Sequence, residues 1–224
     1  VAKLVGYTGD TDELELPNEI EGHTLTAIES GAFAGNTKLK KLTVGDGVVN
    51  IANGALSGCT ALEYLSLGSS VAVFSAFDLE EALLLEKIDV ANANTVFASE
   101  NGVLYNGNRT ALLFCPRALE AESLKLPIGL LKIEENAFAE CKAVKKVELP
   151  EGCALSAFSF FHCTALEQVV LSGGQEAIPE KCFFGCVMLK EISVPEGVLE
   201  IGRLAFFGCV ALSKASLPST VTSI

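Results

Sequence analysis

Hydrophobic residues return along this chain at intervals of about 23 residues, over most of its length. The stretch IGRLAFFGCVALSKASLP, which begins at Ile201, lines up with IPEKCFFGCVMLKEISVP, which begins at Ile178. Related stretches begin at Ile28, Ile51, Ile133 and Leu155. They share the pattern I-x-x-x-A-F-x-G-C-x-x-L-x-x-I-x-L-P-x-x-V. Because a unit this short cannot bury its own apolar side, the recurrence predicts units that stack on a common core.

Each unit contains two extended segments separated by turns. The segment L-x-x-I-x-L predicts a short strand with alternate side chains pointing inward, so Leu189, Ile192 and Val194 should face the core. Pro-x-Gly then predicts a turn, and a second extended run, such as 198–201, precedes A-F-x-G-C. Equivalent strands of successive units should pair in parallel, which predicts a repeat solenoid without a globular α/β core.

One segment, 91–117, breaks the period because it lacks A-F-x-G-C. It carries two Asn-Gly turn signals, and 103–105 and 111–114 resemble the strands of a hairpin. We interpret it as an elaborated coil with the solenoid continuing on both sides. The expectation is therefore a single solenoid domain, residues 1–224, whose last repeat is incomplete at Ile224.

The stretches IGRLAFFGCVAL, IEENAFAECKAV and VFASENGVLYNGNRTALLFCP resemble the BspA-like leucine-rich repeats of bacterial surface proteins, and the resemblance covers essentially the whole chain. It implies a right-handed superhelix or horseshoe made mostly of short parallel β-strands, loops and short helical turns. It also implies a secreted or surface-anchored protein, often linked to adhesion. No set of ligand-contacting residues defines that family, so none is transferred to this sequence.

Cysteines recur at one repeat position, at Cys59, Cys141, Cys163, Cys186 and Cys209, where other units carry Asn36 or Ala82. A catalytic thiol has no need to recur in this way, whereas a tight coil needs a small buried side chain. Stacked equivalents also have parallel Cβ vectors, which suits disulfides poorly. We expect a structural core column. Three further cysteines, Cys115, Cys153 and Cys182, lie outside it and have no assigned role.

Other chemistry-bearing residues lack the geometry that a site needs. His162 beside Cys163 suggests a dyad, but neighbours in a turn seldom face each other. Cys182 and Cys186 have no nearby histidine to complete a zinc site. Asp10 and Asp12 begin a calcium-like pattern whose later spacing fails. We therefore expect no catalytic residue, no metal and no cofactor.

The formal net charge of −12 argues against nucleic acid and anionic membrane surfaces as partners. The longest stretches without charged residues, 64–77 and 152–166, are shorter than the roughly 18 apolar residues of a membrane span. We expect no membrane insertion by this chain, and a monomer.

Two surfaces could hold a partner. The first consists of outward positions of the main strands, among them Tyr64, Lys87, Lys146, Gln168 and Glu191. The second follows the phenylalanine column, where earlier units carry Ala34, Ser57, Glu80 and Ala139 and the last three carry Phe161, Phe184 and Phe207. The alternatives are an ordinary solvated face and rings that tuck under adjacent loops.

These features favour a non-catalytic surface or secreted binding module that mediates protein or glycan interaction, or adhesion, through an extended solenoid face. The alternative is a structural spacer that displays another domain. An enzyme is not expected, and the expected location is extracellular or on the cell surface.

Overall fold

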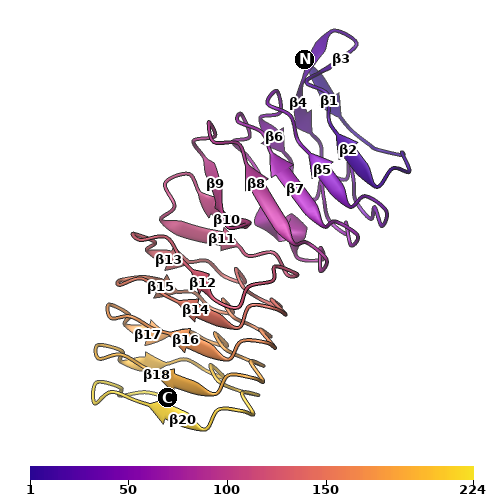
Figure 1. Cartoon of the computed structure of the whole chain (residues 1–224). Coiled ribbons are helices and arrows are strands. Elements are labelled where there is room, and N and C mark those ends of the chain that lie inside the picture. Colours follow the sequence, from indigo (N-terminus) through magenta and orange to yellow (C-terminus); the bar gives the residue numbers. More distant parts are fainter. The chain divides into compact units, whose positions relative to one another are not determined.

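The computed structural model describes residues 1–224, which form two compact units, Val1–Asn108 and Arg109–Ile224. Both units are β-solenoids of short strands, and the chain winds through about nine coils (Figure 1). The one helical element is the 3-10 helix η1 (Ala76–Leu79), and no helix has the length and apolar character needed to cross a membrane. The solenoid class is confirmed. That residues 1–224 act as one domain stays a prediction.

The first unit contains two strand stacks. The main sheet is parallel and consists of β2 (Glu13–Glu15), β5 (Lys41–Thr43), β7 (Tyr64–Leu67) and β8 (Lys87–Val90). The second stack places β4 (His23–Ile28) between β1 (Ala2–Leu4) and β6 (Asn50–Ile51), in parallel, with β3 (Glu19–Ile20) antiparallel to β4. In the main sheet Leu42, Leu65 and Ile88 are buried, and the residues on either side of each point outward.

A hairpin closes the main sheet of the first unit. Strands β9 (Phe97–Glu100) and β10 (Val103–Asn106) are antiparallel, and both turn residues, Asn101 and Gly102, have positive φ, as a type I′ turn requires. The hairpin provides acceptors for backbone N–H groups of β8. The Ile88 N–H donates to the Gly102 carbonyl at 2.9 Å, and the Val90 N–H donates to the Ser99 hydroxyl at 2.9 Å. The segment that breaks the repeat therefore covers the edge of the β8 strand.

The second unit repeats the arrangement more regularly. Its main sheet is parallel and consists of β12 (Leu124–Lys125), β14 (Lys146–Glu148), β16 (Gln168–Val170), β18 (Glu191–Ser193) and β20 (Lys214–Ser216) (Figure 1). The other strands also pair in parallel. Strand β13 (Lys132–Ile133) lies between β11 (Ala111–Phe114) and β15 (Ala154–Leu155), and β17 (Ala177–Ile178) pairs with β19 (Glu200–Ile201). The predicted inward residues Leu189, Ile192 and Val194 are buried.

The A-F-x-G-C turns of the second unit also stack, with Phe138, Phe160 and Phe183 buried in the core and Phe206 half-buried. The rings of Phe138, Phe160, Phe183 and Phe206 follow one another at centroid distances of 4.7, 5.3 and 5.4 Å. Each turn donates backbone hydrogen bonds to the next coil, for example from the Phe138 N–H to the Ser159 carbonyl at 2.8 Å. The turns therefore extend the coil-to-coil hydrogen bonding beyond the strands.

Candidate functional site

The outward side chains of the second unit form a continuous surface across β14, β16, β18 and β20. Residues Lys146, Gln168, Glu191 and Lys214 occupy the same register on successive strands. Two positions further along each strand come Glu148, Val170, Ser193 and Ser216. Since buried residues alternate with these, the sheet holds two rows of side chains at fixed spacing.

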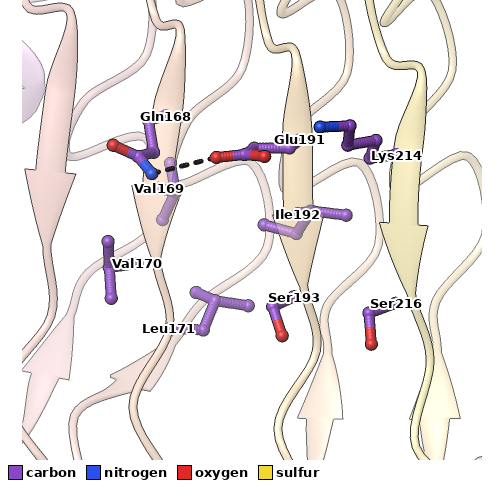
Figure 2. A pocket seen from close by; sticks show the side chains of 9 residues that line it. All are labelled: Gln168, Val169, Val170, Leu171, Glu191, Ile192, Ser193, Lys214 and Ser216. Atoms are coloured by element: carbon purple, nitrogen blue, oxygen red, sulfur yellow. Dashed lines mark hydrogen bonds between the residues drawn. The ribbon is translucent and has the colours of Figure 1, made fainter.

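This surface is hollowed into a groove of about 420 Å³ over β16, β18 and β20, which we call the strand-face groove (Figure 2). The Gln168 amide donates to the Glu191 carboxylate at 3.2 Å along one side. Ser193 on β18 and Ser216 on β20 carry hydroxyls, and β16 contributes the exposed Val170 to the same groove (Figure 2). Lys214 has no carboxylate within ion-pair distance, whereas Lys146 pairs with Glu148 at 2.6 Å. The groove thus presents an ammonium, a carboxylate, an amide and two hydroxyls beside an apolar surface.

In the first unit, the corresponding surface is organised around Tyr64. Its hydroxyl donates to the Asp89 carboxylate at 2.8 Å, and the Lys87 ammonium lies 2.7 Å from the same oxygen. The ammonium groups of Lys41 and Lys87, one coil to either side, lie 5.7 and 5.8 Å from the ring centroid. Partial burial, and then the Asp89 contact, raise the pKa of Tyr64, and Asp89 also raises the pKa of Lys87. The phenol and the ammonium therefore hold their protons at neutral pH.

The recurring cysteines make hydrogen bonds that the sequence does not reveal. The thiols of Cys163, Cys186 and Cys209 donate to the carbonyl of the column phenylalanine one coil earlier, at 2.9, 3.1 and 3.1 Å. Cys59 does the same with Phe33 at 3.2 Å. Burial raises the pKa of Cys59 to about 11, and no cysteine is in a disulfide. These thiols are neutral at physiological pH and are therefore poor nucleophiles.

The second predicted surface lies on the A-F-x-G-C turns of the second unit. Phe161, Phe184 and Phe207 stack with centroid distances of 5.1 Å for each successive pair, and Phe207 is 60% exposed while the other two are half-buried. The His162 ring packs against Phe161 and Phe184 at 4.4 and 5.5 Å. The adjacent Cys163 thiol is directed to Phe138 instead, so the structure brings no imidazole to a thiol.

The acidic residues near the start of the chain do not converge. Asp10 pairs with Lys38 at 3.0 Å, and no group of three or more His, Cys, Asp or Glu side chains in residues 1–224 is arranged to hold a metal ion.

Comparison with known proteins identifies the family to which this repeat belongs. The sequence profile of the BspA-type leucine-rich repeat region matches residues 10–106 and 113–224, in six copies. The chain belongs to the BspA-type leucine-rich repeat family. No curated protein matches it.

Solved structures of bacterial leucine-rich repeat proteins are similar to this BspA-type chain. A pneumococcal vaccine antigen, PcpA, is 25% identical, with a TM-score of 0.73 over 95% of this chain and 62% of its own. A leucine-rich repeat protein from Bacteroides ovatus is 22% identical, with a TM-score of 0.66 over 96% of this chain and 57% of its own. A leucine-rich cell surface protein from Faecalibacterium prausnitzii is 21% identical, with a TM-score of 0.63 over 99% and 86%. The chain thus spans less than two thirds of the pneumococcal protein.

The BspA-type coil also accounts for the three cysteines without an assigned role. Cys153 occupies the buried position of Val48, Val71 and Val198, seven residues after the first residue of the main strand. Cys182 follows the small-residue column of Ala137 and Ser159, and its sulfur lies 3.3 Å from the Ser159 hydroxyl.

Cys115 takes the place of a column phenylalanine. Its N–H donates to the Ala137 carbonyl at 2.7 Å, and its own carbonyl faces the Cys141 thiol at 3.6 Å. These hydrogen bonds identify Cys115 as the residue of the interrupted coil that stands at the phenylalanine position. The spacing of the cysteines in the sequence does not show this.

Proposed function

We propose that this chain is a non-catalytic binding module of a secreted or cell-surface protein, and that the strand faces hold a protein or glycan partner. The observation that carries the proposal is the strand-face groove, where donors, acceptors and methyl groups stand side by side on rigid strands. Preorganised polar groups bind without the entropic cost of ordering a loop. The 25% identity to a pneumococcal vaccine antigen supports a location exposed to the outside of a cell.

The side chains that suggested chemistry support binding over catalysis. The thiols of Cys163 and Cys186 are buried, their pKa values are raised, and each donates to a backbone carbonyl. His162 packs against two aromatic rings, and the thiol of the neighbouring Cys163 donates to the Phe138 carbonyl instead of facing the imidazole. A general base needs hydrogen-bond reach to the group it activates, and this arrangement does not provide it.

The test uses a printed array of neutral and acidic glycans together with purified extracellular host proteins, probed with the whole chain. Any glycan or protein that the wild type retains is then measured against Glu191→Lys, which changes the charge inside the groove. Glu196→Lys, in an exposed turn, makes the same charge change outside it. We expect Glu191→Lys to weaken binding at least about tenfold and Glu196→Lys to leave it unchanged.

Equal effects of the two substitutions would refute the groove as the site. A chain that retains nothing on the array would favour the spacer role instead.

A further inference from the structure

One coil of the second unit brings a second thiol to the cysteine column. At Cys163 and Cys186 the column thiol donates to a phenylalanine carbonyl one coil earlier, but at Cys141 the residue in that place is Cys115. The Cys141 sulfur lies 3.6 Å from the Cys115 carbonyl oxygen and 3.7 Å from that of Pro116. The Cys115 sulfur lies 3.9 Å from the same Pro116 oxygen, so both sulfurs contact one atom.

This pair differs from the other cysteines of the column in its geometry. Stacked equivalents have parallel Cβ vectors, which suit disulfides poorly, but Cys115 stands at the phenylalanine position and is not the stacked equivalent of Cys141. The pair is also the place where a cysteine replaces a large ring in the core, so less side-chain volume separates the column thiol from its neighbour.

A buried arginine lies beside the pair. Arg117 is 3% exposed, although Glu140 and His162, at the corresponding place in the next two coils, are not buried. One terminal guanidinium nitrogen donates to the Asn136 carbonyl at 3.1 Å, and the guanidinium carbon lies 4.4 Å from the centroid of the Phe114 ring. The Nε atom has no hydrogen-bond partner, and no carboxylate lies within ion-pair distance. Since a buried cation is normally paired with an anion, the fold alone does not account for this side chain.

The thiols are the groups that this charge can ionise. Burial raises the pKa of Cys141, but the contact with the Cys115 thiol and the charge of Arg117 outweigh burial and leave that pKa below its ordinary value. Burial, and then the contact with Cys141, raise the pKa of Cys115 well above its ordinary value. Burial raises the pKa of Cys59, a column cysteine of the first unit, to about 11. Because the thiolate is the form that reacts with oxidants, Cys141 is the nucleophile of the pair.

We propose that Cys141 and Cys115 form an oxidation site, at which a small peroxide joins the two sulfurs in a disulfide beside the Arg117 guanidinium. In the first step the Cys141 sulfur attacks one peroxide oxygen and the O–O bond breaks. The leaving hydroxide takes up the proton that Cys141 gives up and departs as water, which leaves a sulfenic acid. The Cys115 sulfur then attacks the sulfenic sulfur, the S–O bond breaks, and the hydroxide leaves as a second water with the Cys115 proton. The two thiols lose two electrons, and one hydrogen peroxide is reduced to two waters.

Access to the site is through local opening of its coil. Cys141 and Cys115 are 1% and 0% exposed, so oxidation should be slower than that of a free thiol in solution. The coil follows the segment that breaks the repeat, and it joins the main sheet through only the two residues of β12. Hydrogen peroxide is close to water in size and needs a smaller opening than a bulky thiol reagent. The site lies in the interior, so its test is independent of the strand-face groove.

The experiment treats the whole reduced chain with hydrogen peroxide, stops the reaction with catalase, and blocks the remaining thiols with N-ethylmaleimide in urea. Tryptic peptides are then mapped by mass spectrometry without reduction. Trypsin releases the two cysteines in separate peptides, 110–117 and 133–142, so their disulfide appears as a linked pair. Cys59 is the internal control, because it is a buried column cysteine whose neighbour one coil earlier is Phe33.

Two variants separate the steps. Cys115→Ser removes the second thiol, and dimedone in the reaction then traps a sulfenic acid at Cys141. Arg117→Met removes the charge and keeps an unbranched side chain in the core. Circular dichroism and the urea midpoint show whether each variant is folded, and the wild-type peptide map decides the proposal without either of them.

We expect the linked peptide in the wild type while Cys59 stays reduced, and a dimedone adduct at Cys141 in Cys115→Ser. Folded Arg117→Met should form the disulfide at least about tenfold more slowly. A wild-type chain without the linked peptide, or with Cys59 oxidised as fast as Cys141, would overturn the proposal. So would a folded Arg117→Met variant that reacts at the wild-type rate.

Discussion

Two amides in one buried column provide the sharpest test of how the coils are stabilised. Seven residues after the first residue of the main strand, most coils bury an apolar side chain, such as Val48 or Val71, but two carry Asn94 and Gln175. Both amides are nearly inaccessible, at 8% and 3% exposure. The amide of Asn94 is hydrogen-bonded at both its nitrogen and its oxygen, whereas the amide of Gln175 is hydrogen-bonded at neither. Replacement by leucine should therefore lower the free energy of unfolding at position 94 and raise it at position 175.

The amide of Asn94 is fully paired. Its nitrogen donates to the carbonyls of Gly68 and Val71 at 2.9 Å each, and its oxygen accepts from the N–H groups of Val96 and Phe97 at 2.8 and 2.9 Å. Asn94→Leu takes a hydrogen-bond partner from four backbone groups, three of them in buried hydrogen bonds and one, the Val96 N–H, part-buried. Since each such group costs about 1–3 kcal/mol and some will reach water, we expect a loss of about 3 kcal/mol.

The amide of Gln175 has no hydrogen-bond partner at either its nitrogen or its oxygen. Gln175→Leu removes these two buried polar atoms and restores the apolar character of the column. Since an unpaired buried polar group costs about 1–3 kcal/mol, we expect a gain of about 2 kcal/mol.

The assay is urea unfolding at 25 °C followed by far-UV circular dichroism, with the slope of the transition compared among the wild type and both variants. If the slope is unchanged, a shift in the urea midpoint reports a change in the free energy of unfolding and not a change in the compactness of the unfolded state. Stabilisation by Asn94→Leu, or destabilisation by Gln175→Leu, would refute this reading of the column.

Three further predictions follow from contacts in the coils. Asp78→Ala should cost about 2 kcal/mol in urea unfolding, because the Asp78 carboxylate accepts from the N–H groups of Gly54 and Leu56 at 2.8 and 3.1 Å; Asp78→Asn, which keeps one acceptor, should cost less. Gly68→Ala should be destabilising by about 2 kcal/mol, because the new Cβ would lie 2.5 Å from the Gly45 carbonyl oxygen, whereas Gly173→Ala, with nothing within 4 Å, should be close to neutral. Burial raises the pKa of Cys59 and Cys153 to about 11 from the ordinary 9.0, so the unfolded chain loses these protons first: the urea midpoint should hold up to about pH 9 and fall towards pH 11, and a midpoint that rises there would contradict the burial.

The sequence predicted the solenoid because its main determinant is periodic. Apolar residues at fixed phase, such as Leu189 and Ile192, are buried as the pattern requires, since burial of a strand face depends only on alternation. The family followed from the same recurrence.

Hydrogen bonding between coils could not be predicted from single residue types. Asn94 and Gln175 look equivalent in the sequence, and only the positions of neighbouring carbonyls and N–H groups separate them. Asp78 similarly stands where other coils have alanine and pairs with backbone N–H groups of another coil. The candidate strand positions could be named in advance, but the strand-face groove depends on how far Gln168, Glu191 and Lys214 extend from adjacent strands.

The recurring cysteines fill the interior of the coils, which leaves the outer surfaces for the partner that we propose. Thiol labelling with a chromogenic disulfide reagent at pH 8, under native conditions and in urea, measures whether these thiols are shielded from solvent. Seven of the eight cysteines are buried and Cys209 is partly exposed, so the folded chain should react slowly and at no more than one thiol, and the unfolded chain at all eight. Rapid labelling of Cys59, Cys163 or Cys186 in the folded chain would show that the recurring cysteines are in contact with solvent and would contradict their place in the core.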